Sequence, residues 1–316
     1  MTTESPNAGT ALIAIRSVAA TAVAFLAIGQ GGRFYPVLDI ANAFLAPLLV
    51  LLVVLLALAL KLKDRPTAVV TAVALTIAAL QFANPMAVSH AQTSGAADLR
   101  LLTQSTWHDN KHPKQLQRFL ETQGADIVVL QETDGSASRV VAGVLPDYHR
   151  VRSCSQAVCS LTIISRWPLR RIATRARDGP LADMLIADVD APFGSFRLIN
   201  VHLPRPYRAN ASKLNAQLLA EIEAGKEPPL IVAGDFNHVV NSFSLSRFAR
   251  ASGLTAIEGF RPTYPAHLPL PAIIGIDHVF VSAEWAAVAC RTVRGAGSDH
   301  HGIGCRLRLD RILTGH

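Results

Sequence analysis

The sequence predicts an α/β fold, in which sheets are covered by helices, behind three membrane-spanning helices. The chain has 316 residues and is 50% hydrophobic, and most of its apolar excess lies before residue 84, so a membrane region precedes a soluble one. Beyond residue 98, short apolar runs typical of buried strands alternate with amphipathic helical patterns. Strand-like runs outnumber helical ones, and helices packed on sheets bury the apolar faces of both.

Three apolar segments make up the N-terminal region, residues 1–83, at about 11–28, 37–60 and 67–83. A spanning helix needs about 20 mainly apolar residues. The second segment meets this length easily, and the third is at its short end. We reject a cleaved signal peptide for the first segment, because no basic stretch precedes it and further apolar segments follow.

The loops between these segments predict the orientation in the membrane. Lys61, Lys63 and Arg65 separate the second and third segments, whereas Arg33 stands between the first and second. The positive-inside rule therefore places the loop after the second segment in the cytoplasm. Three spans then put the soluble region outside, which in a bacterium means an inner-membrane protein with a periplasmic domain. The lipid bilayer is the expected partner of the helices, and no protein partner is evident.

Residues 84–97 are small and polar, as in a linker, and the soluble domain is predicted over residues 98–316. Ser89–Ala91 resembles a small-residue cleavage site, so later release of the domain stays open. The formal net charge of the chain is +7, and residues 98–316 hold 25 Lys+Arg and 20 Asp+Glu, hence 25 − 20 = +5. A basic surface suits phosphate-bearing or membrane-surface partners, but no dense Lys/Arg run strengthens this signal.

The four cysteines all lie in the soluble region, at Cys154, Cys159, Cys290 and Cys305. Two local pairs would suit an oxidising compartment, and four free thiols are the alternative. Their spacings do not match a zinc site. The sequence leaves the pairing open.

The periodicity of the soluble region predicts a series of strands and three helices. Strands are expected at Leu99–Thr103, Asp126–Leu130, Leu161–Ser165, Leu185–Val189, Phe196–Val201, Leu230–Ala233, Asp277–Ser282, Ala287–Arg291 and Gly304–Leu309, and helices at Pro113–Gln123, Ala211–Ala224 and Ser242–Ala251.

The stretch Pro229–Asn241 is central to the prediction. Its apolar run reads as a strand buried on both faces, and Gly234 allows a turn where a side chain would crowd the backbone. Asp235 and Asn237 follow at the carboxyl end, where sheets present polar groups to ligands. A carboxylate there can accept a proton, and an amide can donate to an oxyanion. The alternative is an Asp-x-Asn turn held by local hydrogen bonds.

Other polar residues stand at further strand ends. Glu132 follows one apolar run and His202 follows another, while Asp277 opens a strand. Asp299 and His300 come directly after a glycine-rich turn. Each residue alone can be explained by a structural role, as a cap, a turn residue or a core histidine. Together and in this order they indicate a functional site.

The motifs ADIVVLQET, NVHL, GDFN, IDHVFVS and SDHHG occur in this order, and SRWPL adds a further match. With them the soluble region, roughly residues 98–312, resembles the endonuclease/exonuclease/phosphatase superfamily, and three preceding helices resemble its membrane-anchored bacterial members. The resemblance implies the DNase-I-like four-layer α/β sandwich. It also implies hydrolysis of phosphate esters, mostly phosphodiesters, with a divalent cation, usually Mg²⁺, with Mn²⁺ as the alternative.

The resemblance also implies roles for individual residues. It makes Asp235 the group that orients or deprotonates the attacking water, and Asn237 a group that holds the phosphoryl oxygens. It makes His300 a phosphate contact or proton carrier, and Asp277 the carboxylate that fixes its tautomer. His202 matches a second histidine facing the phosphate. His301 and His278 are expected to be structural.

The implied metal site contains one departure from the family pattern. Glu132 matches the metal carboxylate, and Asp299 stands near the metal or acts as a base. The first strand of the family usually ends in a metal-binding Asn, where this chain has Ser105, while Asn110 keeps a later Asn. A serine hydroxyl is a shorter and weaker ligand, which could act through water, or Asn110 or Asp109 could reach in. Metal affinity would then be lower, or the metal would sit differently. A tolerated variant is the alternative, and we favour it over loss of activity.

The predicted function is that of a membrane-tethered, metal-dependent phosphoric ester hydrolase. Nucleic acid, a phospholipid head group and a small phosphate ester all suit the chemistry, and Arg205 and Arg208 are candidate phosphate ligands. The alternative is a catalytically impaired membrane-anchored binding protein, which only Ser105 motivates. A channel or transporter needs more spans and more intramembrane polar residues than this chain offers.

Overall fold

The computed structural model describes residues 6–83, 98–155, 158–175, 184–208, 211–224 and 229–309. The chain divides into two compact units, one of Met1–Pro85 with Asn241–Ser244 and one of the remaining residues. The expected linker at 84–97, with its cleavage-like Ser89–Ala91, lies outside the described residues.

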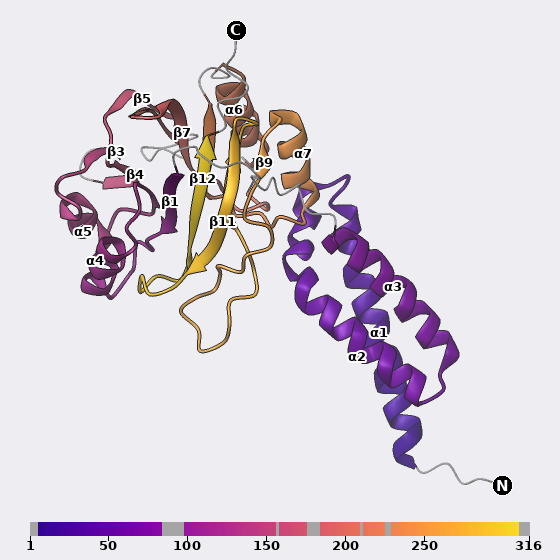
Figure 1. The fold of residues 1–316 in the computed structure, drawn as a ribbon. Coiled ribbons are helices and arrows are strands. Elements are labelled where there is room, and N and C mark those ends of the chain that lie inside the picture. The colour runs from indigo at the N-terminus through magenta and orange to yellow at the C-terminus, as the bar shows by residue number, and fades with distance from the viewer. Residues whose placement is uncertain are drawn as a thin grey trace. The chain divides into compact units, whose positions relative to one another are not determined.

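The N-terminal unit is helical (Figure 1, indigo to violet). Its α-helices are α1 (Pro6–Gly31), α2 (Leu45–Lys61) and α3 (Arg65–Ala83). Three helical segments, Gly9–Gly31, Pro36–Lys61 and Arg65–Ala83, are long and apolar enough to cross a membrane. Leu26, Leu52 and Ala78 are buried where the helices pack together.

The start of the second apolar segment differs from the expected α-helix over 37–60. Pro36–Phe44 forms a 3₁₀ helix, and the α-helix begins only at Leu45. The side-chain amide of Asn42 donates to the Gly29 carbonyl (3.1 Å) and to Asp39 Oδ1 (2.7 Å), and both polar side chains are buried. These contacts give Asp39 and Asn42 partners inside an otherwise apolar segment, which a regular helix at this position would not necessarily provide.

The larger unit contains two six-stranded sheets, in the orders β11-β12-β1-β2-β4-β3 and β5-β6-β7-β8-β10-β9. The strands are β1 (Asp98–Ser105), β2 (Ile127–Gln131), β3 (His149–Ser155), β4 (Val158–Ser165), β5 (Leu169–Arg175), β6 (Met184–Ala191), β7 (Gly194–His202), β8 (Leu230–Asp235), β9 (Thr255–Ala256), β10 (Asp277–Val281), β11 (Trp285–Val293) and β12 (Gly302–Leu309). The sequence patterns missed β3, β5 and β9, whose residues are more polar or too few to form an apolar run.

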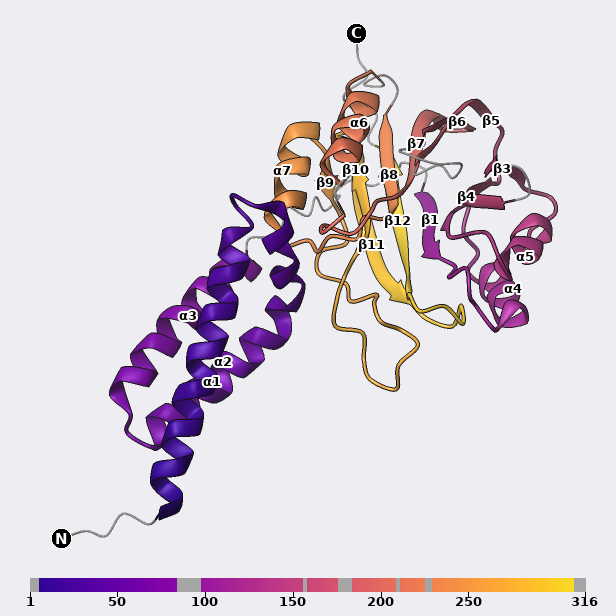
Figure 2. The same cartoon turned by 180° about the vertical axis from the view of Figure 1, so that it is seen from behind.

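The sheets pack face to face, and helices cover their outer faces. Side chains from both sheets, such as Leu101 and Ile231, are buried between them. Helices α4 (Pro113–Thr122) and α5 (Ala137–Gly143) pack on the first sheet, and α6 (Ala211–Ala224) and α7 (Phe243–Ser252) pack on the second. Figures 1 and 2 show the two helix pairs on opposite sides of the sheets. The expected four-layer α/β sandwich is confirmed.

Both cysteine pairs that the sequence left open are disulfides. Cys154–Cys159 joins β3 to β4, and Cys290–Cys305 joins β11 to β12. In each case the bonded residues face each other directly across neighbouring antiparallel strands.

Candidate active site

The backbone of the second sheet places three of the predicted site residues directly opposite one another on neighbouring strands. His202 at the end of β7 pairs in parallel register with Asp235 at the end of β8, and Asp277 at the start of β10 pairs with Asp235 from the other side. Residues opposite each other in neighbouring strands point to the same face of the sheet. The sheet hydrogen bonds therefore place an imidazole and two carboxylates side by side.

Gly234 makes the close approach of β7 and β8 possible. Its φ is +146°, and a Cβ at this position would lie 2.0 Å from the carbonyl oxygen of Val201. Only glycine fits such a backbone contact without displacement. The sequence suggested a turn at Gly234, but the structure keeps Gly234 inside β8, where its lack of a side chain lets the strand approach β7 and pair His202 with Asp235.

His300 completes the arrangement from the loop between β11 and β12. Its Nδ1 lies 2.9 Å from Asp277 Oδ2, and its Nε2 lies 3.9 Å from Asp235 Oδ2. The loop is fastened to the end of β1, because Ser298 Oγ accepts from the His300 amide (3.1 Å) and donates to the Ser105 carbonyl (2.7 Å). His300 is therefore held between two carboxylates.

Electrostatics in this buried group favour a charged imidazolium. Burial disfavours protonation of His300, but the charges of Asp277, Asp235 and Asp299 and the hydrogen bond that Nδ1 donates to Asp277 outweigh it and raise the His300 pKa to about 10. Burial, with the charge of Asp277, raises the pKa of Asp235 to about 6, against the opposing charges of His300 and His202. A carboxyl group with such a pKa can exchange a proton near neutral pH.

Glu132 faces the same space from the first sheet. It follows β2 with a φ of +51°, a conformation that non-glycine residues adopt with strain and that often occurs at active sites. The His108 amide donates to Glu132 Oε2 (3.2 Å). His202 Nε2 lies 3.7 Å from Glu132 Oε1 and 3.7 Å from Asp235 Oδ2, so this imidazole lies between carboxylates of the two sheets.

Asn237 also has a positive φ, +52°, which Asn tolerates better than most residues. Its amide N donates to Asp235 Oδ1 (2.8 Å), which is the local bond expected of an Asp-x-Asn turn. Its side-chain Nδ2 donates to the Leu203 carbonyl (2.8 Å). Since a side-chain amide carries two N–H groups, one stays available to a ligand. The turn is thus present and also orients Asp235.

The oxygen donors suit a hard divalent cation. Burial raises the pKa of Asp299, and the negative charge of Glu132 adds to this effect. Ser105 Oγ is buried and has no hydrogen-bond partner among the described residues. Carboxylates and a hydroxyl oxygen are the kind of ligands that such a cation takes.

Among the described residues, Asp235, Asp277 and His300 form a group that could hold a metal, since one donor atom of each lies within 4.8 Å of the others. The hydrogen bond between His300 Nδ1 and Asp277 equally suits a proton-transfer array, so this group has two candidate uses.

Three further predicted residues lie in different surroundings. The side chain of Asn110 is buried and bonds the Thr106 and Ala296 carbonyls and the His112 amide, so it braces the loop after β1. The guanidinium of Arg205 donates to Tyr207 Oη (3.2 Å), and this bond, with the charge of Asp235 among smaller causes, raises the pKa of Arg205. Arg208 lies over the Tyr207 ring.

Sequence reasoning missed two aromatic residues at the site. The Tyr264 ring lies 5.1 Å from the His300 ring, centroid to centroid, and His267 stacks on Trp107 at 5.7 Å. Both belong to the connection between β9 and β10, which carries no motif. Only their position ahead of the IDHVFVS strand could have pointed to them.

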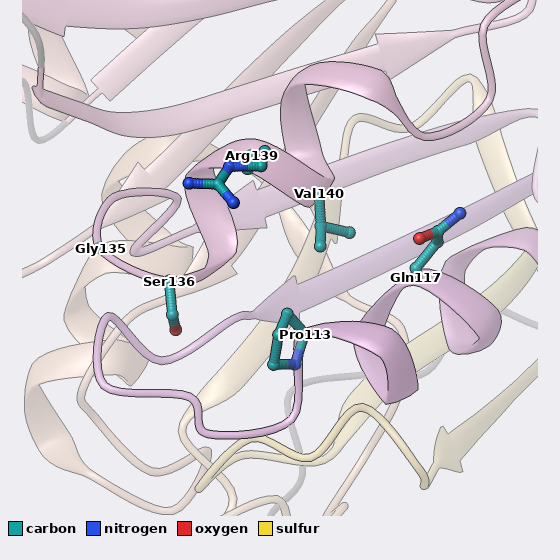
Figure 3. A pocket seen from close by; sticks show the side chains of 6 residues that line it. All are labelled: Pro113, Gln117, Gly135, Ser136, Arg139 and Val140. Atoms are coloured by element: carbon teal, nitrogen blue, oxygen red, sulfur yellow. The ribbon is translucent and has the colours of Figure 1, made fainter.

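A separate pocket of about 420 Å³ lies between α4 and α5 (Figure 3). It is lined by Pro113, Gln117, Gly135, Ser136, Arg139 and Val140. None of the predicted catalytic residues lines it, so it is distinct from the site at the strand ends.

The fold and this site define a class of protein, the DNase-I-like phosphoesterases, in which carboxylates and histidines gather at the strand ends of a four-layer sandwich. The sequence profile described as "Endonuclease/Exonuclease/phosphatase family" matches residues 102–300. This chain belongs to the endonuclease/exonuclease/phosphatase family. A search of curated proteins found no match.

Solved structures share the fold at low sequence identity. An endonuclease/exonuclease/phosphatase from Bacteroides vulgatus is 17% identical, with a TM-score of 0.59 over 68% of this chain and 100% of that one. D. rerio TDP2, solved with a single strand DNA product, is 17% identical, with a TM-score of 0.55 over 67% and 99%. The beta toxin of Staphylococcus aureus, solved with bound magnesium ions, is 12% identical, with a TM-score of 0.51 over 68% and 100%.

Proposed function

We propose that this chain is a membrane-tethered, divalent-metal-dependent phosphodiesterase. The observation that carries the proposal is the placement of His300 between Asp277 and Asp235 at the ends of the strands. It combines a proton acceptor with a pKa of about 6 and a histidine with a pKa of about 10 in one buried group. Family membership and the three membrane-compatible helices support the remaining parts of the proposal.

Each side chain of the site has its own role in the proposed hydrolysis. Asp235 accepts a proton from the water that attacks phosphorus, and the bond to the leaving oxygen breaks, after which this oxygen takes a proton from solvent. His300, held in one orientation by Asp277, donates through Nε2 to a phosphoryl oxygen and offsets its charge. His202 and Asn237 face the same space and hold the other phosphoryl oxygens. Asp277 keeps the imidazole oriented, as a carboxylate does for a catalytic histidine.

Glu132 and Asp299 would hold the cation, with Ser105 as a weak neutral ligand or a contact through water. A bound Mg²⁺ or Mn²⁺ supplies a Lewis acid that polarises the phosphoryl group. The chain's own contribution is the carboxylate pair and the buried surroundings that keep it oriented.

The direct test uses the full chain in detergent with bis(p-nitrophenyl) phosphate, with Mg²⁺, Mn²⁺ or EDTA. We expect turnover that requires the metal and that falls by about a hundredfold or more in Asp235→Asn, because a positioned base contributes at least that much. Asp147→Asn, at an exposed position, is the matched control and should keep wild-type turnover. Equal turnover in Asp235→Asn and wild type would contradict the proposal.

A catalytically impaired binding protein is the second candidate, and Ser105 is the observation that favours it. If the wild type is inactive and Ser105→Asn is active, the chain has lost its metal site and this second function holds.

A further inference from the structure

The connection between β9 and β10 contains an exposed loop, Pro265–Ile273, which we call the apolar loop. Backbone hydrogen bonds close its base, since the Tyr264 amide donates to the Ile274 carbonyl (2.9 Å) and the Ile274 amide donates back to the Tyr264 carbonyl (3.0 Å). Figures 1 and 2 both show this connection as a long loop that projects beyond the strand ends. The apolar loop is thus a defined protrusion on a closed base.

The exposed side chains of the apolar loop are unusually hydrophobic. Leu268, Leu270 and Ile273 are 45%, 70% and 41% exposed. Among the described residues of the α/β unit, the other large hydrophobic side chains with comparable exposure are Val158, Ile172 and Tyr207, each on a different element. Scattered exposed apolar residues need no explanation, whereas a group on one protrusion indicates an interaction surface.

The base of the apolar loop forms one wall of the active site. The Ala266 amide donates to the Asp299 carbonyl (2.6 Å), and the His301 amide donates to the Thr263 carbonyl (2.8 Å). Tyr264 packs beside His300, and His267 stacks on Trp107. A surface that the apolar loop enters would therefore lie next to the reacting groups.

The composition of the loop suits the interior of a lipid layer. Arg261 is the only Asp, Glu, Lys or Arg between Glu258 and Asp277, so the loop itself carries no formal charge to desolvate. Pro265, Pro269 and Pro271 have no backbone N–H, which removes donors that hydrocarbon would leave unpaired. A nucleic-acid surface would instead require Lys or Arg side chains toward the phosphates.

From this geometry we propose that the apolar loop inserts Leu268 and Leu270 into a lipid surface and presents the active site to phosphodiesters of lipid head groups. The substrate part rests on the phosphodiesterase function proposed above. Two observations identify a bilayer as the occupant. The chain carries three helices able to cross a membrane, and residues 98–316 have a net charge of 25 − 20 = +5, which attracts anionic lipid.

The insertion test needs no enzymatic activity. All four native cysteines form disulfides, so Leu270→Cys introduces one reactive thiol for an environment-sensitive fluorophore. The labelled full chain is reconstituted into phosphatidylglycerol/phosphatidylethanolamine vesicles. We expect a blue-shifted emission, quenching by spin labels on the acyl chains and protection from iodide. Ile172→Cys, an exposed apolar position on β5, is the matched control and should remain accessible to iodide. Equal iodide quenching at both positions would overturn the insertion.

The activity test compares a lipid with a soluble substrate. In the same vesicles, Leu268→Asp/Leu270→Asp should lower phospholipid hydrolysis by about tenfold or more, because charge replaces buried apolar surface. Turnover of bis(p-nitrophenyl) phosphate should stay within about twofold of wild type, and Ile172→Asp should change neither rate. An equal loss on both substrates would show that the loop only supports the site, and would overturn the proposal.

The outcomes separate this inference from the function on which it rests. No metal-dependent turnover of the soluble diester by wild type would refute the phosphodiesterase, while the fluorophore still reports whether the loop inserts. Turnover of the soluble diester without phospholipid hydrolysis would refute the lipid substrate alone. DNA cleavage that the double Asp variant loses, without phospholipid hydrolysis, would assign the loop to nucleic acid instead.

Discussion

Asp235 shows how burial adapts one residue to catalysis. Its pKa of about 6 lies above the ordinary value of 3.8, chiefly because burial disfavours the charged carboxylate. The hydrogen bond from the Asn237 amide and the charges of His300 and His202 act in the opposite direction and limit the rise. The residue therefore titrates near neutral pH instead of remaining ionised throughout.

This pKa predicts the pH dependence of activity. Below about pH 6 Asp235 is protonated and cannot accept a proton, so kcat/KM should rise with pH up to about 6. His300, with a pKa of about 10, stays protonated over neutral pH, and activity should fall only near pH 10. A cation in the site would move the lower limb to still lower pH, since positive charge favours the carboxylate. A rate that falls steadily from pH 5 to 8 would contradict this assignment.

Ser105 allows a prediction about the metal. Because its hydroxyl is buried without a partner among the described residues, Ser105→Ala removes no hydrogen bond and should leave the thermal unfolding midpoint nearly unchanged. If the hydroxyl helps to hold the cation, the Mg²⁺ concentration for half-maximal turnover should rise several-fold. An unchanged Mg²⁺ titration would show that Ser105 is only a tolerated replacement for Asn.

The residues of the site differ in how far the sequence could predict them. Asp235, Asp277 and His300 follow or precede recognisable strands in short motifs, and the structure brings these three together. Tyr264 and His267 reach the site only because their loop folds back onto the loop of His300. No local pattern encodes such a long-range contact. The side-chain bonds of Asn110 to a distant carbonyl were likewise not predictable from spacing.

At the scale of elements, the pairing of β7 with β8 depends on Gly234. Gly234→Ala would place a Cβ against the Val201 carbonyl at a φ that L-residues rarely adopt. We expect a loss of about 3 kcal/mol or more in stability, together with loss of activity, measured by thermal unfolding of the full chain in detergent. Gly143→Ala, which meets no atom within 4 Å at the end of α5, is the control and should be neutral or slightly stabilising. Equal effects of the two would contradict this role.

Periodicity predicted the elements that are apolar on a buried face, such as β2, β8 and α4. It missed β3 and β5, which lie at the edges of their sheets and are rich in Arg and other polar residues. Edge strands bury less surface, so their pattern is weaker. The 3₁₀ start of the second apolar segment was missed because Asp39 and Asn42 are satisfied by contacts that hydropathy does not reveal.

At the scale of the whole molecule, we propose that the helices at Gly9–Gly31, Pro36–Lys61 and Arg65–Ala83 span the inner membrane and place the α/β unit on the periplasmic side. The disulfides Cys154–Cys159 and Cys290–Cys305 agree with an oxidising compartment. Reporters fused to the C-terminus test this orientation. One that is active only in the cytoplasm should be inactive, and one that needs export should be active. The opposite pattern would reverse the orientation.

The pairing of His202, Asp235 and Asp277 across three neighbouring strands also limits how this protein can evolve. Main-chain hydrogen bonds set the spacing of the three positions, and replacing a side chain leaves those bonds in place. Substitutions there can therefore explore new chemistry on an unchanged scaffold. Inserting one residue into β8 would instead turn Asp235 to the opposite face of the sheet. Descendants of this chain should thus diversify by substitution at these three paired positions and by length changes only in the surrounding loops.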